Sequence, residues 1–533
     1  MFSPITDSRF DFRPELVSAP MWAKGLLFVF AGAVHLVANL LYASTYGSLS
    51  SPDMDIWFFV GLARGDHHVF STDPLQIFLP ILGFLGPSSL YVLLVLLSNA
   101  FHLFTLWLLF GALTDFFNDE WAALWSCAFF TLTVTSGFTF CTGSFVHQQE
   151  ALPVLVGLLW SGNLFMMAST WQEKLRHAGV IVALLLLGAI IGPEVLVICT
   201  LAIPCAMVWY FRRFMDPFIR HAMGTLLLAL YFATIFVAGP FMVKVISFGG
   251  QFFQGISSQA NQDLRLGGLA PMEWMDVLDV YGPVYLLFVA LAIWTWSNGR
   301  FPELALIFTG VIFSTVAARF FFIAELGFAA LVCWVLARPL RYQTIPKSVV
   351  GAGLLVVMAA FACWKGVPCA YPGSFVRVLE QIEKDPRGNP RVLCTPTYGS
   401  MVRAVSGAKP TSDSRGIDPQ WVRIATMAAD EAMPMLAAKG ITHLFLTSRD
   451  FNLGTRLDFH GTSETAFISS GGFAPLVNEM SREQITASLV YRALLGKDPV
   501  SGLTPIGEAN HPATEQRAIL FRVEPLAPPV AVP

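Results

Sequence analysis

The sequence predicts a polytopic α-helical membrane protein with a C-terminal α/β domain outside the bilayer. Three observations lead to this fold class. The 533 residues are 55% hydrophobic and only 13% charged, and the mean hydropathy is +0.61. Apolar runs long enough to cross a bilayer recur up to residue 367, whereas residues 371–533 contain polar and charged residues at an ordinary soluble frequency. The overall composition excludes a soluble enzyme.

The apolar runs define the membrane-spanning part. A spanning helix needs about 20 mostly apolar residues, because each residue rises roughly 1.5 Å through a hydrocarbon core about 30 Å thick. We expect about 11 to 13 transmembrane helices. Eleven can be placed, over residues 22–43, 88–112, 121–139, 150–169, 178–192, 194–210, 223–245, 283–297, 303–318, 320–337 and 348–367. The fifth and sixth are separated at the turn formed by residues 192–194.

The connecting loops alternate in their content of lysine and arginine. One set contains Arg9, Arg13, Lys24, Lys174, Arg176, Arg212, Arg213, Arg220, Arg300, Arg338, Arg341 and Lys347, and the other chiefly Arg64, Lys244 and Arg265. By the positive-inside rule the N-terminus is cytoplasmic, and an odd number of spans places the C-terminal domain outside. We therefore expect a multi-pass protein of the inner (plasma) membrane with a periplasmic or extracellular C-terminal domain. The first apolar segment is longer than a signal-peptide core and is interpreted as an uncleaved anchor.

Two domains follow from this pattern. Residues 1–367 form the membrane domain, with external loops at 44–87 and 246–282, and residues 368–533 form the external domain. Within the external domain we expect strands at 391–393, 441–447 and 518–523. An amphipathic helix is expected at 421–439, ended by Gly440.

The net charge argues against a nucleic-acid partner. The formal net charge is −3 and the sequence pI is about 6.4. Binding to a phosphate backbone requires clustered lysine and arginine, which this chain lacks. We expect the bilayer and membrane-associated molecules to be the partners instead.

Two carboxylates, Asp53 and Asp55, follow the first apolar segment where the chain meets water. Carboxylates at the mouth of a membrane protein can hold a metal ion or handle an anionic lipid headgroup, and such positions warrant a functional hypothesis. The alternative is that they are solvated loop residues that cap the helix after them.

The external segments carry a family pattern. DIWFFVGLAR, at 55–64, resembles the first external loop of the catalytic subunit of oligosaccharyltransferase. RVLCTPTYG at 391–399, KPTSD at 409–413, IA at 424–425 and GITHL at 440–444 are similar to that family's external domain, where a strand ends in a WWDYG motif. The resemblance covers the hydropathy profile, the external loops and about the first half of the external domain.

This resemblance implies a C-type glycosyltransferase fold. It also implies transfer of a sugar or oligosaccharide from a polyprenyl phosphate or diphosphate carrier to an acceptor, expected to be a protein, on the non-cytoplasmic face. The departing phosphate carries concentrated negative charge, which explains the need for a divalent metal, Mg or Mn, held by carboxylates, and for a nearby guanidinium.

The resemblance assigns metal-binding and catalytic roles to acidic residues in two places. Asp55 matches the acidic residue of the first loop that binds metal and contacts the acceptor amide, with Asp53 as a less securely placed second ligand. Glu150 matches the second acidic motif, in which two carboxylates are separated by one residue. Gln148 replaces the first of these, and His147 can supply the missing donor, since imidazole and carboxylate both suit a divalent ion. The alternative for Glu150 is a charge that favours the start of a helix.

Three further residues are expected to bind substrate through the same resemblance. Arg319 is similar to the family arginine that holds the carrier phosphate; the alternatives are snorkelling to the interface or pairing with Glu325. Gln259 stands near the place of a glutamate in the family's mobile external loop, and Asp263 or Glu273 can substitute for it. Any single residue of this glycine-rich loop can equally be structural.

The acceptor-binding motif departs most from the family. The sequence TPTYG, at 395–399, stands in place of WWDYG, so both tryptophans and the aspartate are absent, and Tyr398 is the aromatic residue left to contact substrate. The Asn-x-Ser/Thr rule is therefore not predicted for this chain.

The leading functional hypothesis is thus a membrane glycosyltransferase that uses a polyprenyl-linked sugar donor and a protein or envelope-glycan acceptor. One alternative is a C-type transferase that moves a single sugar onto lipid or polysaccharide. Another is a non-catalytic scaffold or a transporter. The acidic external mouth and the external domain favour an enzyme, because a transporter more often places its ionisable residues near the middle of the membrane.

Overall fold

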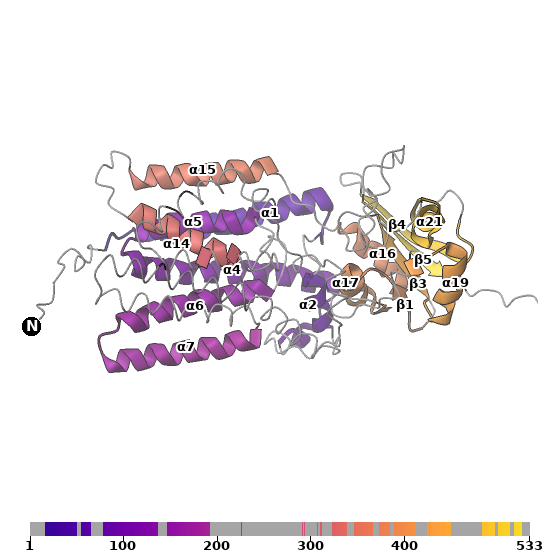
Figure 1. The fold of residues 1–533 in the computed structure, drawn as a ribbon, viewed down its shortest axis with the longest axis horizontal. Coiled ribbons are helices and arrows are strands. Elements are labelled where there is room, and N and C mark those ends of the chain that lie inside the picture. Colours follow the sequence, from indigo (N-terminus) through magenta and orange to yellow (C-terminus); the bar gives the residue numbers. More distant parts are fainter. Residues whose placement is uncertain are drawn as a thin grey trace, which may run out of the picture.

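The structure is a computed structural model in which long helices lie side by side and a β-sheet lies beyond one end of them (Figure 1). It describes residues 16–50, 55–64, 78–136, 147–191, 225, 290, 293, 306–307, 310–311, 322–337, 346–365, 372–383, 388–411, 424–425, 427–448, 482–495, 499–511 and 516–524. For some of these, including Asp55, His147 and Glu150, only the backbone is described.

Seven long helices form the helical region of the described chain. They are α1 (Met21–Tyr46), α4 (Pro87–Phe117), α5 (Glu120–Ser136), α6 (His147–Met167), α7 (Trp171–Ile191), α14 (Phe322–Ala337) and α15 (Lys347–Lys365). Each coincides with one of the apolar segments expected from the sequence. The other four expected segments, 194–210, 223–245, 283–297 and 303–318, lie almost entirely outside the described residues.

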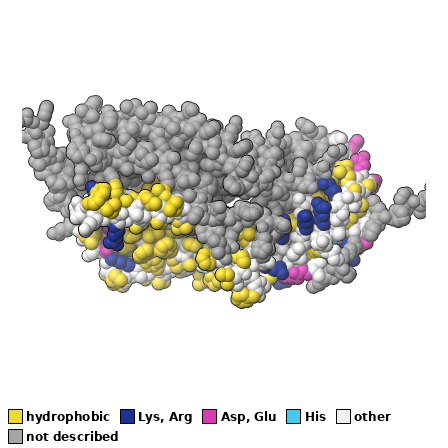
Figure 2. Space-filling model, turned by 90° about the horizontal axis from the view of Figure 1, so that it is seen from below, with side chains coloured by type: hydrophobic (Ala, Val, Ile, Leu, Met, Phe, Trp, Pro, Cys, Tyr) yellow, Lys and Arg dark blue, Asp and Glu magenta, His cyan; other side chains and the backbone are white. Residues whose placement is uncertain are grey.

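Two of the described helices, α1 and α4, are long and apolar enough to cross a bilayer, while the apolar helical stretches 151–165, 323–337 and 347–360 are shorter. The outer surfaces of these helices are unusually apolar. On α1, Trp22 and Val29 are exposed, on α4 Leu96 and Trp107, and α7 exposes Leu186. Figure 2, which views the molecule from the side where α7 lies in Figure 1, shows apolar side chains on the described surface of the helical region, with Lys and Arg side chains at its end far from the sheet. An exposed apolar surface of this kind suits contact with lipid.

Buried ion pairs join three helices at the end far from the sheet. Lys24 of α1 lies 2.6 Å from a carboxylate oxygen of Glu120 at the start of α5, and the other oxygen accepts the backbone N–H of Ala19 at 2.7 Å. Lys347 of α15 pairs with Asp119, whose second oxygen accepts the N–H of Ala122 at 3.0 Å. Asp119 thus caps α5 and binds α15 at the same time, while Glu120 binds α1 and Ala19, which precedes it.

A short helix, considered from the sequence only in the alternative in which Asp53 and Asp55 cap it, lies between the long helices and the sheet. This helix, α2 (Asp55–Ala63), was expected to belong to a solvated external loop. Its apolar residues are instead almost completely buried, and a 3₁₀ turn, η1 (Leu79–Leu82), follows it in the described chain. Burial on all sides of a helix explains why its sequence is apolar throughout rather than amphipathic.

The sheet has five strands in the order β2-β1-β3-β5-β4. They are β1 (Arg391–Leu393), β2 (Lys409–Pro410), β3 (His443–Thr447), β4 (Leu503–His511) and β5 (Gln516–Val523). β1 pairs in parallel with β2 and β3, whereas β5 is antiparallel to β3 and β4. The strands expected at 391–393, 441–447 and 518–523 are present within about two residues of their expected ends, and β2 and β4 are additional.

Both faces of the sheet are covered by helices. Alternate residues of β3 belong to different cores, Phe445 to one and Leu444 and Leu446 to the other, as the two-residue period of a strand requires. The Phe445 core includes α16 (Ser374–Glu383) and α17 (Pro396–Ser406), and the opposite core includes α19 (Ala429–Ala438) and α22 (Leu489–Leu495), which follows the short helix α21 (Arg482–Ala487).

The helix expected over 421–439 is interrupted. Residues 424 and 425 are helical, but Ala428 is extended and forms a bridge with Ser488, so α19 begins only at Ala429. The predicted end is correct, since Gly440 has a φ of +64°, which favours glycine after a helix.

Candidate active site

The first acidic candidate, Asp55, is the first residue of α2. Figure 1 places α2 between the long helices and the sheet. A carboxylate at the start of a helix is favoured by the helix dipole, whichever role it has. Its neighbour Asp53 lies outside the described residues, and the direction of the Asp55 side chain is likewise not described.

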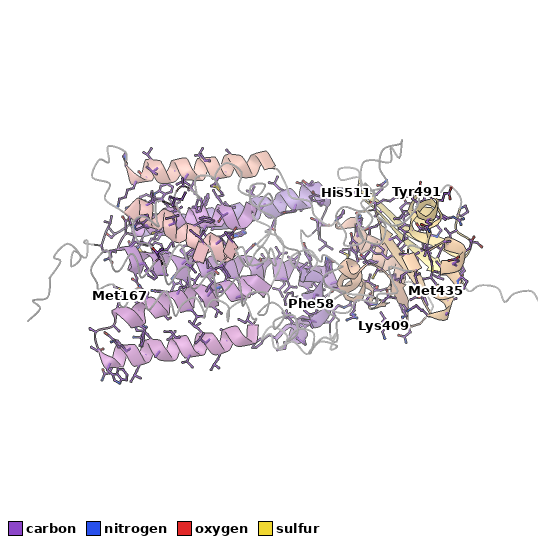
Figure 3. All side chains as sticks on the ribbon, viewed as in Figure 1. Phe58, Met167, Lys409, Met435, Tyr491 and His511 are labelled. Atoms are coloured by element: carbon purple, nitrogen blue, oxygen red, sulfur yellow. The ribbon has the colours of Figure 1, made fainter. Side chains whose placement is uncertain are left out.

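The second acidic candidate, Glu150, lies in the first turn of α6, together with His147, which begins that helix. The other end of α6 is Met167, which Figure 3 labels far from the sheet. The first turn of α6 therefore faces the sheet-bearing end, where α2 also lies. The structure thus brings the backbones carrying Asp55 and Glu150 to the same end of the helical region.

Packing holds α2 rigidly in place. Ile56, Trp57 and Phe59 have no exposed surface. The Trp57 ring lies 5.2 Å from the ring of Tyr91 on α4, whose hydroxyl donates a hydrogen bond of 2.5 Å to the Ser50 carbonyl. A residue at the start of such a buried helix has a well-fixed backbone, which is what a preorganised site needs.

A functional candidate without an assigned role in the sequence stands at the other end of α2. The guanidinium of Arg64 donates to the carbonyl of Ala404 at 2.7 Å and to that of Val405 at 3.4 Å, both in the last turn of α17. The sequence alone could have singled out Arg64, since it is the cation that ends the otherwise apolar segment 56–63. Its partners, 340 residues further along the chain, could not be read from the sequence.

Tyr398, expected to contact substrate, is a core residue in this structure. Its side chain has no exposed surface and its ring contacts the rings of Phe375 and Phe445. Its hydroxyl accepts a hydrogen bond of 3.3 Å from Thr447 in β3. Residues 396–406 form a helix, α17, which places the Tyr398 ring against the sheet rather than at a surface, and its contact with substrate stays a prediction.

The remaining substrate-binding candidates, Arg319, Gln259 and Asp263, lie outside the described residues. Glu325, considered as a partner of Arg319, is in the first turn of α14 and is only 1% exposed.

The donors at the two helix starts suit a divalent metal. Carboxylate oxygens with one imidazole nitrogen form a set that Mg or Mn accepts. Among the side chains that the structure does describe, no group of three or more His, Cys, Asp or Glu residues is placed to hold a metal. The donor types of Asp55, Glu150 and His147 suit the ion that the family resemblance implies, while the directions of their side chains are not described.

Two buried histidines also lie inside the helical region. The rings of His35 on α1 and His102 on α4 are 4.5 Å apart and nearly perpendicular, and His102 stacks at 6.2 Å on Phe130 of α5. A perpendicular arrangement of aromatic rings is a favourable packing geometry. The pair contributes to the helix packing, but both ring nitrogens of His35 and Nε2 of His102 are buried without a hydrogen-bond partner among the described residues.

The fold matches known oligosaccharyltransferase structures. A crystal structure of the Archaeoglobus fulgidus oligosaccharyltransferase, tethered to an acceptor peptide containing the NVT sequon, superimposes with a TM-score of 0.61 at 11% identity, over 92% of this chain and 79% of that one. The archaeal oligosaccharyltransferase AglB from the same organism, in complex with an inhibitory peptide and a dolichol-phosphate, gives 0.58 at 11% identity, over 92% and 80%. No protein-family model and no curated protein sequence matches. The chain has the oligosaccharyltransferase fold at very low sequence identity, as the sequence resemblance predicted.

Proposed function

We propose that the protein is a membrane glycosyltransferase that transfers a sugar or oligosaccharide from a polyprenyl-linked phosphate or diphosphate donor to an acceptor outside the cytoplasm. The observation that carries the proposal is the fold match over 92% of the chain to an oligosaccharyltransferase. The helix starts that bear Asp55 and Glu150 add support, because they occupy one end of the helical region.

Each acidic residue has a definite task in this reaction. Asp55 and Glu150, with His147 and Asp53 as further donors, would hold a divalent Mg or Mn ion, which when bound neutralises the negative charge of the departing phosphate. Asp55 would also accept a hydrogen bond from the attacking group of the acceptor and orient it toward the sugar.

The basic and polar candidates complete the donor site. Arg319 would bind the carrier phosphate, since a guanidinium offers paired donors that match phosphate oxygens. Gln259 and Asp263 would contact bound substrate from the external loop.

The site would open on the non-cytoplasmic face. Lys24 and Lys347 lie at helix ends far from the sheet, and Lys174 and Arg176 begin α7 at that same end. The positive-inside rule assigns this end to the cytoplasm and the sheet, with α2, to the outside. The protein would then be a multi-pass protein of the inner (plasma) membrane.

The acceptor is proposed to be a protein or an envelope glycan. A neighbour of the same fold binds an acceptor peptide. In this chain, however, the segment corresponding to the WWDYG motif is part of α17, and Tyr398 is buried there. The acceptor would therefore be recognised by other residues, and a single-sugar transferase acting on lipid or polysaccharide is the second candidate.

The test is transfer of radiolabel from lipid-linked sugars to the envelope fraction, using parent protein, Asp55→Asn, Glu150→Gln and the control Glu380→Gln. Glu380 is an exposed carboxylate on α16. We expect each site variant to lose at least about 100-fold in transfer rate, with the control unchanged. Equal transfer by the parent and Asp55→Asn would reject the catalytic assignment, and no transfer by any folded form would favour a scaffold.

A further inference from the structure

We infer that Arg64 is a positioning residue that fixes α2, and with it Asp55, to the sheet-bearing region through the end of α17. The inference rests on the proposed function, because it concerns the geometry of that same site. It makes the external region a structural part of the site.

The contact has the chemistry of a strong helix cap. The last carbonyls of an α-helix lack partners within the helix and carry partial negative charge. At the end of α17, Gly407 has a φ of +67° and its N–H donates to the Arg403 carbonyl at 3.0 Å. The guanidinium of Arg64 satisfies the carbonyls of Ala404 and Val405, which follow. A cation placed there gains both hydrogen bonds and a favourable helix dipole.

Close packing along α2 links the position of Arg64 to the position of the Asp55 backbone. Arg64 continues the last turn of α2, since its N–H donates to the carbonyls of Val60 and Gly61 at 3.2 and 3.1 Å. Asp55 is nine residues earlier, about 13 Å along the helix axis. Between the two ends, Ile56 and Val60 of α2 belong to the same hydrophobic core as Met401 of α17. Because this core is close-packed, a displacement of one end of α2 is transmitted to the other.

The site therefore spans two regions that are distant in sequence. The same core contains Tyr91 at the start of α4, Phe375 of α16 and Phe445 of β3. No solvent layer separates α2 from the sheet in this core. A change at Arg64 is thus expected to affect catalysis although Arg64 lies at the opposite end of α2 from the proposed chemistry.

The test compares Arg64→Met, which keeps an unbranched apolar stem but removes every donor, with Arg64→Lys, which keeps the charge and a point donor. The matched control is Arg377→Ala, which changes an exposed arginine on α16, a helix whose apolar face belongs to the same core. Two measurements are made on purified protein in lipid nanodiscs. One is hydrogen–deuterium exchange of the backbone amides of residues 56–64, and the other is kcat and KM for sugar transfer.

For Arg64→Met we expect exchange in α2 to accelerate by about tenfold or more, and kcat to fall by about tenfold while KM for the donor changes less than about twofold. Arg64→Lys should give intermediate values in both measurements, and Arg377→Ala should match the parent. Partial recovery by lysine distinguishes positioning from a general loss of packing.

Parent-like exchange in Arg64→Met, or faster exchange with parent-like kcat, would overturn the inference. If Arg64→Met does not accumulate as folded protein, Arg64→Lys decides by the same two criteria. If the parent itself transfers no sugar, the proposed function fails. Hydrogen–deuterium exchange then tests the Arg64 contact by itself. Faster exchange of α2 in Arg64→Met would support the role of Arg64 in fixing α2 to α17, and unchanged exchange would overturn it.

Discussion

At the scale of single residues, the buried carboxylates at the start of α5 do more than cap one helix. Glu120 accepts a hydrogen bond from the ammonium group of Lys24 on α1 and another from the backbone N–H of Ala19, which precedes α1. Removing one member of a buried ion pair leaves the other uncompensated, which costs more than the pair itself contributes. These residues are structural, although a sequence search for functional carboxylates would select them as readily as Asp55.

We predict that Glu120→Gln lowers the free energy of unfolding by about 2 kcal/mol, because the amide retains the N–H of Ala19 as a partner but loses the attraction to Lys24. Thermal unfolding in detergent measures the change. The exposed Glu380→Gln serves as the control and should not shift the midpoint. An unaltered midpoint in Glu120→Gln would show that the pair contributes nothing.

At the scale of elements, the position of α2 depends on close approach of the turn η1. Gly83, just after η1, has ordinary helical backbone angles, so its glycine is not needed for conformation. A Cβ at this position would overlap the carbonyl oxygen of Ala63 at the end of α2. A backbone atom cannot move aside as a flexible side chain can, so η1 and α2 would have to separate.

Gly83→Ala is therefore expected to destabilise the protein by about 1–3 kcal/mol through overpacking and to reduce transfer by displacing α2. The matched control is Gly388→Ala, where a Cβ meets nothing within 4 Å. Differential scanning fluorimetry and the transfer assay provide the measurements. Similar melting midpoints for the two variants would mean that η1 does not constrain α2.

The sequence predicted elements well where apolar length alone determines them, as in α1, α4 and α15. It placed α2 within an external loop and gave a helix there only as an alternative, because a short apolar segment beside acidic residues has the same composition whether it is a loop or a buried helix. It did not show that Tyr398 is buried, because the family motif gave its position but not the helix that turns its ring inward. It also gave no partner for Arg64, since contacts between distant segments leave no local pattern.

At the scale of the whole molecule, the arrangement of charge and apolar surface defines two ends. The end with Lys24 and Lys347 is rich in basic residues, and ion pairs there join α1 and α15 to the start of α5. The other end holds α2 and the sheet. Apolar helix surfaces lie between them. We propose that the positive-inside rule orients the protein with this basic end in the cytoplasm.

This orientation predicts the outcome of reporter fusions. Alkaline phosphatase fused after residue 524 should be active because it reaches the oxidising side, and the same reporter fused between α6 and α7, near residue 169, should be inactive. Green fluorescent protein at the two positions should give the opposite pattern. Activity of the phosphatase at residue 169 would invert the proposed topology and place the acidic site in the cytoplasm.

The central claim is that Asp55 and Glu150 belong to one metal site at the outer edge of the bilayer. Electron paramagnetic resonance of Mn²⁺ titrated into the purified protein tests it without knowledge of the sugar or the acceptor. We predict one bound ion per chain, with affinity reduced at least about tenfold by either Asp55→Asn or Glu150→Gln and unchanged by Glu380→Gln. If either site variant binds Mn²⁺ as tightly as the parent, the two carboxylates do not share a metal and the account is wrong.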